Sequence, residues 1–360
     1  MAAWSLGGWS VVAVATFLSA ASCTRLGIAY AQHRQLIDQP GQRRSHRVAT
    51  PRGGGIGIVV GVLLAAAAIA ATAQAPDRAI ALSVLAAIVV VAGVGWIDDH
   101  GGLRARTRFA AHCLAAGILL ASLAMAVGLL GSGFRPGALL VYMLAAVAPG
   151  ALVVWSINLH NFMDGIDGLL AMQVLFVSGS LALSCLHAGH PDEAGAVALL
   201  AAATAGFLPF NFPRARIFMG DVGSGVLGLL IAVAVGWQML TPGVPRLTGI
   251  VLGSAFVTDA TCTLLSRMLR GRRWYSAHRE HLYQWLARSG FSHAQVVALY
   301  MGWNVLIVLP AVCWMNRAPD ARMSSAIAPA VVVYALAVSA WWFGKRWCLA
   351  ATTARGRHAA

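Results

Sequence analysis

Residues 79–99 read AIALSVLAAIVVVAGVGWIDD, an apolar run that ends in two aspartates. A helix needs about 20 such residues to cross the hydrocarbon core of a bilayer. Comparable runs recur along the whole chain, which is 59% hydrophobic and only 11% charged, with a mean hydropathy of +0.73. A soluble domain would carry about 25% charged residues. The sequence therefore predicts a multi-pass membrane protein.

The runs predict an all-α polytopic membrane helix bundle of about 11 transmembrane helices, since only helices and closed barrels span lipid. We expect one multi-pass membrane domain over residues 1–345 and a basic tail over 346–360. The six cysteines stand singly and form no CxxC pair, which argues against a zinc site or a disulfide framework. The expected spans are 4–22, 54–75, 79–97, 109–130, 138–158, 167–187, 194–212, 223–240, 248–268, 296–315 and 326–343.

Basic residues gather in alternate loops, as the positive-inside rule requires of the cytoplasmic side. Of the 26 Lys and Arg residues, all but Arg78, Arg135, Arg246, Arg317 and Arg322 fall on one side. This asymmetry places the N-terminus in the periplasm and the C-terminus in the cytoplasm of a bacterial inner membrane. It also explains the formal charge of +14, so we predict no nucleic-acid partner. The expected cytoplasmic loops are about 30–52, 98–108, 159–167, 213–222 and 269–295.

The chain has only 12 acidic residues, and half of them fall in four islands on the predicted cytoplasmic side. Each island lies at the end of an apolar run or in the adjoining loop, where an unpaired carboxylate is costly. Carboxylates near arginines and glycines suit a metal ion together with phosphate. Four islands on one face therefore predict one site. They are Asp98-Asp99, Asp164 with Asp167, Asp221, and Glu280 between Arg279 and His281.

The first two islands favour a functional site over a structural explanation. Asp98 and Asp99 close a helix, where negative charge opposes the macrodipole; the alternative is a solvated helix end. Residues 158–168, NLHNFMDGIDG, bring amides and carboxylates into a tight turn through two Asp-Gly steps. An ordinary polar loop is the alternative there. The spacing does not match the alternate acidic positions of an EF-hand loop.

Three other motifs are ambiguous when taken alone. Residues 218–224, FMGDVGS, open a helix whose N–H groups suit phosphate and whose Asp221 suits Mg²⁺, although an N-cap explains them equally well. Residues 45–55, SHRVATPRGGG, place cations before glycines at a helix entry, but positive-inside charge with close helix packing also accounts for them. His278 and His281 lack a third zinc ligand, so phosphate contact is favoured over metal.

Asp259 differs from the islands because it is expected inside an apolar run. A carboxylate there costs about 2.5–3.5 kcal/mol at mid-bilayer. It therefore needs a partner, and Arg267, two turns along the same helix, is the candidate. A buried structural pair and a direct part in catalysis are equal alternatives.

Taken in order, these motifs resemble the polyprenyl-phosphate N-acetylhexosamine-1-phosphate transferases. These are polytopic bacterial enzymes related to the phospho-MurNAc-pentapeptide transferase of peptidoglycan synthesis. The resemblance covers about residues 43–290 and rests on five motifs together, since any one alone is unspecific. The motifs are Thr50-Pro51-Arg52-Gly53-Gly54, Asp98-Asp99, residues 161–168, residues 218–224 and Arg279-Glu280-His281.

The resemblance implies that polyprenyl phosphate attacks the β-phosphate of a UDP-sugar and releases UMP. It implies Mg²⁺ as cofactor, with Mn²⁺ as the alternative, held by Asp221 and supported by Asp99. The implied partners are a UDP-N-acetylhexosamine, undecaprenyl phosphate and membrane lipids, with a homodimer left open. The implied catalytic residues are Asp98, Asp99, Asp164, Asp221 and His281, and the implied substrate-binding residues are Thr50, Arg52, Asn161, Asp167, Phe218 and Arg279.

One motif departs from the family pattern. Many members carry His-x-His-His in the last cytoplasmic motif, whereas this chain reads His281-Leu282-Tyr283-Gln284. That ending resembles the branch that initiates O-antigen or related surface glycans, with GlcNAc or a 6-deoxy N-acetyl sugar as alternatives. It places the peptidoglycan substrate second.

Other protein classes fit the sequence less well. The motif of a CDP-alcohol phosphotransferase would begin as residues 164–171 do, but Met172 stands where that motif requires Arg. A transporter would place charges near the midplane and show inverted repeats, whereas these charges gather at one face. A P-loop NTPase is excluded because the sole lysine, Lys345, lies near the C-terminus.

Overall fold

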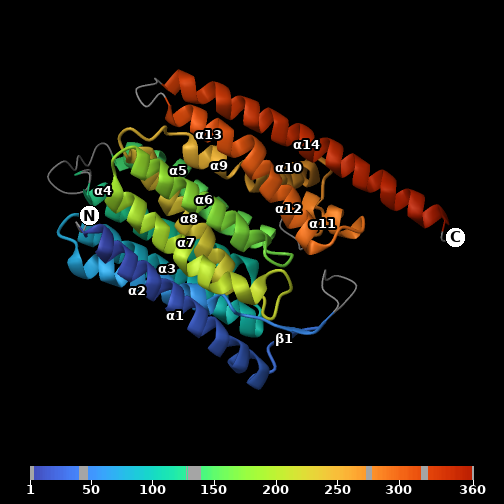
Figure 1. Ribbon diagram of the computed structural model, residues 1–360, viewed down its shortest axis with the longest axis horizontal. Coiled ribbons are helices and arrows are strands. Elements are labelled where there is room, and N and C mark those ends of the chain that lie inside the picture. Colours follow the sequence, from blue (N-terminus) through green and yellow to red (C-terminus); the bar gives the residue numbers. More distant parts are fainter. Residues whose placement is uncertain are drawn as a thin grey trace.

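Long apolar helices lie side by side in one bundle, shown for the computed structural model in Figure 1. The structure describes residues 4–39, 48–126, 128, 139–272, 278–317 and 323–358. The helices are α1 (Leu6–His33), α2 (Ile56–Thr72), α3 (Asp77–Gly101), α4 (Ala105–Ala126), α5 (Leu139–Met163), α6 (Leu169–His187), α7 (Pro191–Asn211), α8 (Asp221–Leu240), α9 (Thr248–Leu252), α10 (Ser254–Leu269), α11 (Leu282–Arg288), α12 (His293–Trp303), the π-helical turn η2 (Asn304–Val308), α13 (Leu309–Asn316) and α14 (Met323–His358).

The helices confirm the predicted all-α multi-pass membrane fold. Among the described residues, nine helical segments are long and apolar enough to cross a membrane. α12, η2 and α13 form one of these segments, over His293–Asn316. A tenth predicted span is α2, which is apolar but shorter, with 17 residues. The direction in which the bundle crosses the membrane stays a prediction.

The predicted span over 248–268 consists of two helices, α9 and α10, which are separated at Gly253. The side chain of the buried Gln173 contacts the backbone at this point. Its Nε2 donates to the carbonyl oxygen of Leu252 at 3.2 Å, and this bond from α6 fixes the backbone at the end of α9. A tertiary hydrogen bond of this kind leaves no periodic signal in the sequence.

Glycines allow three helices to approach closely at one end of the bundle. A Cβ atom on Gly95 of α3 would lie 2.6 Å from the carbonyl oxygen of Asp221, the first residue of α8. A Cβ atom on Gly55, just before α2, would lie 2.4 Å from the Cα atom of Gly223. Small residues at helix crossings are the usual device for close packing in membranes. Here they bring the ends of α2, α3 and α8 together.

Apolar side chains face outward as well as inward, as expected of a protein surrounded by lipid. Leu140, Val141, Leu144 and Leu152 of α5 are each more than 60% exposed. By contrast, α6 and α8 contribute a large share of the buried core. The C-terminal helix α14 is 36 residues long and projects past the other helices in Figure 1.

Irregular segments gather at the end of the bundle where α3 ends and α8 begins. The short strands β1 (Ile37–Asp38) and β2 (Thr50–Pro51) pair antiparallel there. The next residue, Arg52, forms a parallel bridge with Phe218, so the entry to α2 is tied to the entry to α8. The α5–α6 turn and helix α11 lie at the same end (Figure 1).

Candidate active site

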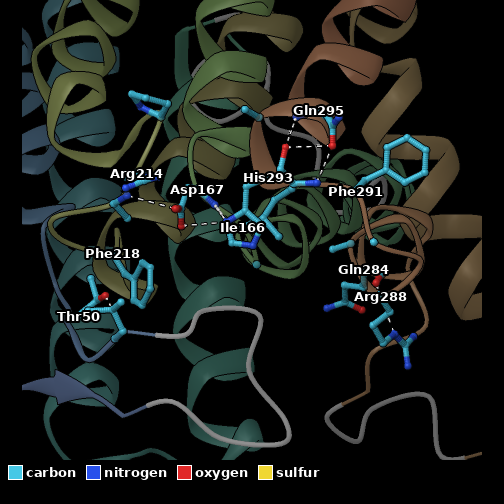
Figure 2. Close-up of a pocket in the computed structure, with 18 of the residues that line it drawn as sticks. Thr50, Ile166, Asp167, Arg214, Phe218, Gln284, Arg288, Phe291, His293 and Gln295 are labelled. Carbon is cyan, nitrogen blue, oxygen red and sulfur yellow. Dashed lines mark hydrogen bonds and ion pairs between the residues drawn. The ribbon is translucent and has the colours of Figure 1, made fainter. Parts of the chain in front are cut away.

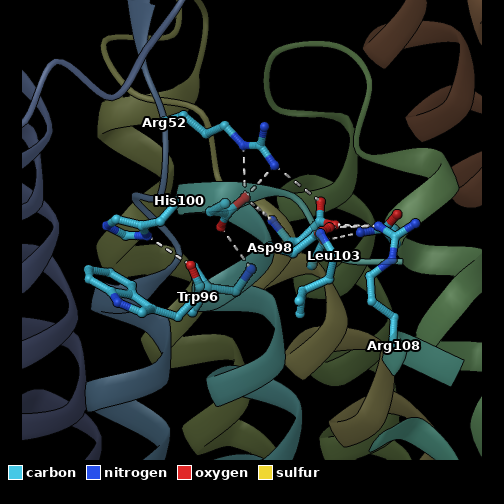
Figure 3. Close-up of polar contacts among 11 residues, drawn as sticks. Arg52, Trp96, Asp98, His100, Leu103 and Arg108 are labelled. Carbon is cyan, nitrogen blue, oxygen red and sulfur yellow. Dashed lines mark hydrogen bonds and ion pairs between the residues drawn. The ribbon is translucent and has the colours of Figure 1, made fainter. Parts of the chain in front are cut away.

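Three aspartates and two arginines from four segments meet at this end of the bundle. We call Asp98, Asp99 and Asp221, with Arg52 and Arg108, the carboxylate–arginine cluster (Figure 3). Asp98 and Asp99 stand in the last turn of α3, and Asp221 begins α8. The structure therefore contains the predicted convergence of the Asp98-Asp99 island with the Asp221 island. Each carboxylate has a cationic partner, which removes the cost of burying it unpaired.

Asp99 holds the first turn of α8. Its carboxylate accepts hydrogen bonds from the backbone N–H groups of Asp221 at 3.0 Å and Val222 at 3.1 Å. It also accepts from Arg52 Nε at 2.8 Å, and its side chain is only 2% exposed. Gly220, with φ of 77°, permits the approach, since a Cβ atom there would lie 2.5 Å from Asp99 Oδ2. Asp99 therefore acts as a cap supplied by another helix, and it fixes the position of Asp221.

Arg108 joins the other two carboxylates. Its Nη1 atom lies 2.7 Å from Asp98 Oδ2 and 3.0 Å from Asp221 Oδ2. Asp98 also accepts a hydrogen bond from the backbone N–H of Leu103. The sequence pattern did not single out Arg108, because it falls in a basic loop that the positive-inside rule already explains. The positively charged Arg108 side chain thus lies between Asp98 and Asp221.

The α5–α6 turn brings a further carboxylate toward the cluster. Burial, reinforced by the nearby Asp221 and Asp99 carboxylates, raises the pKa of Asp164 well above its usual range, with Arg52 opposing the shift. The turn is held by Gly168, whose N–H donates to Asn211 Oδ1 at 2.8 Å. Just before the turn, Asn161 Nδ2 donates to Ser224 Oγ of α8 at 3.1 Å. Asn161 also lines a cavity of about 40 Å³ together with Arg108 and Asp221.

The donor set fits a divalent cation that arrives with a substrate. Among the described residues, no three His, Cys, Asp or Glu side chains are grouped so that they could hold a metal ion. Mg²⁺ commonly uses one or two carboxylates and completes its shell with water and substrate phosphates. Asp98 and Asp221, which both contact the Arg108 guanidinium group, supply such a pair. Asp99 as a metal ligand stays a prediction, and its present bonds give it the capping role described above.

A cavity of about 870 Å³ opens beside the cluster (Figure 2). Four of the six predicted substrate-binding residues line it: Thr50, Asp167, Phe218 and Arg279. Asp167 is held at its wall, because its Oδ2 accepts from the N–H of Ala215 at 3.1 Å and its Oδ1 lies 3.3 Å from His293 Nδ1. The other two predicted residues, Arg52 and Asn161, lie in or next to the cluster instead.

The opposite wall of the cavity was missed by the sequence analysis. It comes from the residues on and around α11 and α12, of which only Arg279 was predicted to bind substrate. Gln284 was quoted as part of the last cytoplasmic motif without a role, and no motif contained the residues after it. The lining residues of this wall that carry polar side chains are Gln284, Arg288, Ser292, His293 and Gln295.

His281 lies away from the cavity lining, inside an aromatic stack. Its ring packs against Phe162, His278 and Tyr283, with centroids 5.0 to 6.1 Å apart, and it is 2% exposed. Its Nδ1 atom lies 3.8 Å from Asp259 Oδ1. The predicted catalytic role of His281 stays a prediction, and its contacts support a packing role beside Asp259.

The expected pairing of Asp259 with Arg267 is wrong. Arg267 bonds to Glu280, which Arg272 also contacts at 3.0 Å. These two arginines outweigh burial and lower the pKa of Glu280. Glu280, the acidic residue of the fourth island, is thus neutralised by Arg267 and Arg272, and it does not join the carboxylate–arginine cluster. Asp259 bonds instead to groups from α11, α12 and α14.

Comparison with known proteins agrees with the motifs. The sequence model for glycosyl transferase family 4 matches residues 81–237. The chain is 32% identical to the decaprenyl-phosphate N-acetylglucosaminephosphotransferase of Mycobacterium leprae, over 78% of this chain and 77% of that protein. It is 27% identical to the probable undecaprenyl-phosphate N-acetylglucosaminyl 1-phosphate transferase of Bacillus subtilis, over 78% and 79%. It is also 32% identical to the phospho-N-acetylmuramoyl-pentapeptide-transferase of Symbiobacterium thermophilum, over 74% and 82%.

Proposed function

The chain belongs to glycosyl transferase family 4, and on that premise we propose that it transfers an N-acetylhexosamine 1-phosphate from a UDP-sugar to a polyprenyl phosphate. The products are a polyprenyl-diphospho-sugar and UMP. The activities for which the relatives are named favour N-acetylglucosamine as the first sugar to test. The relatives are named for two different lipid acceptors, decaprenyl phosphate and undecaprenyl phosphate, so both should be tested. We also propose that the product enters the synthesis of O-antigen or a related surface glycan, because the last cytoplasmic motif resembles that branch of the family.

The observation that carries the proposal is that the backbone joins the cavity lining directly to the carboxylate–arginine cluster. Phe218 lines the cavity, and its backbone is bridged to Arg52, whose guanidinium group lies 2.6 Å from Asp99 and 3.8 Å from Asp221. A nucleotide in the cavity would therefore extend its diphosphate toward the cluster. A diphosphate needs cationic groups on its oxygens, and phosphoryl transfer depends mainly on positioning and charge neutralisation.

Each part of the site has a proposed task. Asp167 and Phe218 would hold the uracil, and Thr50 and Arg279 would contact the sugar or phosphates. Arg52 and Arg108 would turn from the carboxylates toward the phosphate oxygens when substrate binds, which frees Asp98 and Asp221. Asp98 would orient the attacking lipid phosphate. Mg²⁺, held by Asp221 and Asp98, would neutralise charge on the diphosphate.

We place the site at the cytoplasmic face of a bacterial inner membrane. The support is the asymmetry of Lys and Arg, which are abundant in the loops at the site end of the bundle. UDP-sugars are polar and cannot cross lipid, so a site that uses them must open to the cytoplasm. The lipid phosphate would reach the cluster from the surrounding membrane between helices.

The test is release of UMP by the purified protein in detergent. Reactions contain Mg²⁺, decaprenyl or undecaprenyl phosphate, and one sugar from a panel of UDP-N-acetylhexosamines that includes UDP-MurNAc-pentapeptide. We expect UMP only when lipid phosphate and UDP-N-acetylglucosamine are both present. UMP from UDP-MurNAc-pentapeptide alone would move the protein to the peptidoglycan reaction named for the Symbiobacterium relative. No UMP from any pair, with folded protein, would overturn the proposal.

A further inference from the structure

Asp259 is a buried carboxylate at which four helices meet. It lies on α10 and is only 2% exposed. Its Oδ1 atom accepts from the Leu282 N–H at 2.7 Å and from Trp341 Nε1 at 3.2 Å. Its Oδ2 atom accepts from the Tyr283 N–H at 3.3 Å and from the Tyr300 hydroxyl at 2.7 Å. These donors come from α11, α12 and α14, so one side chain fixes the N-terminus of α11 against two other helices.

Tyr283 carries this restraint to the other wall of the cavity. Its side chain is 1% exposed, and its hydroxyl donates to the carbonyl oxygen of Phe162 at 2.9 Å. A Cβ atom on Gly165 would lie only 2.1 Å from that hydroxyl, so the α5–α6 turn packs directly against the tyrosine. Gln284 Nε2 donates to the same hydroxyl at 3.1 Å. Asp259, Tyr283 and the turn that bears Asp164 are thus connected by adjacent contacts.

The two ends of this connection belong to the proposed site. Gln284 and Arg288 of α11 line one wall of the cavity, and Gly165 and Asp167 of the α5–α6 turn line another. The contact between Asp167 and His293 at 3.3 Å joins the same turn to α12, and the Tyr283 connection joins it to α11. A displacement of about 1 Å in such a site can lower the rate by about 100-fold.

We propose that Asp259 is a positioning residue for the transferase reaction, acting through Tyr283 to set the spacing between α11 and the α5–α6 turn. This inference rests on the proposed function. Asp259 touches neither the cavity nor the cluster: its partners are the first residues of α11, the His281 ring, Thr263 of its own helix, and the buried groups of α12 and α14. The competing explanation is a carboxylate that only stabilises the fold. That explanation predicts a loss of stability with unchanged kinetics in the folded fraction.

Three variants separate the two explanations. Asp259→Asn conserves shape but places an NH₂ group against a backbone N–H in either orientation of the amide, because both carboxylate oxygens accept from α11. Tyr283→Phe keeps the ring and removes only the hydroxyl that contacts Phe162. The matched control is Tyr300→Phe, which removes a hydrogen bond to the same carboxylate at a residue outside the cavity lining.

For folded, monodisperse protein we expect the KM for the UDP-sugar to rise about 30-fold in Asp259→Asn and about 10-fold in Tyr283→Phe, with kcat reduced less than about fivefold. Tyr300→Phe should lower the thermal midpoint and leave KM within about twofold. The double variant Asp259→Asn/Tyr283→Phe should be no worse than Asp259→Asn alone, because both changes break the same connection. Hydrogen exchange of residues 162–167 should rise in the first two variants and not in the control.

Several results would overturn the inference. Unchanged KM in both Asp259→Asn and Tyr283→Phe would do so, as would a double variant whose effects multiply. Equal hydrogen exchange of residues 162–167 in all variants would also contradict it. Should Asp259→Asn fail to fold, Tyr283→Phe and Tyr300→Phe still decide between the explanations. Failure of the proposed function looks different, because wild-type protein would then release no UMP while the exchange experiment remained informative.

Discussion

At the scale of single residues, the site is a set of three carboxylates that share two arginines. Asp99 has two backbone donors and Arg52, and Asp98 and Asp221 share Arg108. The aspartates could be picked out from the sequence because acidic residues are rare in this chain and costly next to a membrane. Arg108 could not be picked out in this way, because it stands among several arginines that the positive-inside rule already explains. The true partners of Asp259 were likewise hidden, since they come from three other helices.

Asp221→Asn should abolish turnover while leaving the fold intact. The substitution keeps the first residue of α8 and its N–H bond to Asp99, but it removes the negative charge that Arg108 and a divalent cation need. We expect UMP release to fall at least about 100-fold, with an unchanged elution profile on size exclusion. Activity close to wild type would remove Asp221 from the reacting centre.

Asp164 should make the stability of the metal-free protein depend on pH. Its pKa is raised in the folded state by burial and by neighbouring carboxylates, so the folded protein holds this proton more tightly than the unfolded chain. Its stabilising contribution is therefore complete below the ordinary pKa of about 4 and is lost as pH rises through the raised value. We expect the thermal midpoint to fall with rising pH in this window, and to fall less in Asp164→Asn.

The matched measurement repeats the pH series with Mg²⁺ present. If the cation lies near Asp164 and its neighbours, it should recover part of the midpoint lost at high pH in the wild type. Identical pH profiles for wild type and Asp164→Asn would show that this carboxyl does not titrate differently in the folded state.

At the scale of elements, the site depends on how closely the helix ends approach. The order and approximate bounds of the helices followed from hydropathy, because burial in lipid selects uninterrupted apolar runs. The break at Gly253 and the α11–α12 wall did not, because tertiary contacts such as the bond of Gln173 to Leu252 leave no periodic signal in the sequence. Thr50, Asp167, Phe218 and Arg279, which line the cavity, were named without this knowledge, because each stands in a motif that carries the resemblance to the family.

Gly95→Ala should separate α3 from α8 and disturb the cluster. The new methyl group would meet the backbone of Asp221 at 2.6 Å and could not be accommodated without movement of a helix. We expect a loss of about 1–3 kcal/mol in the free energy of unfolding and a fall in activity of at least about 10-fold. Gly93→Ala is the matched control, because nothing lies within 4 Å of its added Cβ atom.

The control should be neutral or slightly stabilising, by up to about 1 kcal/mol, because alanine favours a helix over glycine. Thermal denaturation and UMP release, measured on both variants, check the pair. Equal behaviour of the two variants would mean that the contact between α3 and α8 does not set the geometry of the cluster.

At the scale of the whole molecule, the question is which way the bundle crosses the membrane. The loops at the site end carry most of the basic residues, so they should face the cytoplasm. We expect a green fluorescent protein fused after residue 360 to fluoresce and an alkaline phosphatase fused there to be inactive. An active phosphatase fusion would invert the predicted topology and place the cavity on the side that lacks nucleotide sugars.

The length of α14 has a practical consequence. A helix of 36 residues spans about 54 Å, whereas the hydrocarbon core is about 30 Å thick. About 20 Å of helix therefore separates Lys345 from His358, and Figure 1 shows this end leading away from the bundle. The end of α14 can therefore act as a helical spacer. An affinity tag or surface tether attached at the C-terminus would be held away from the bundle, which leaves the opening of the cavity free for ligand.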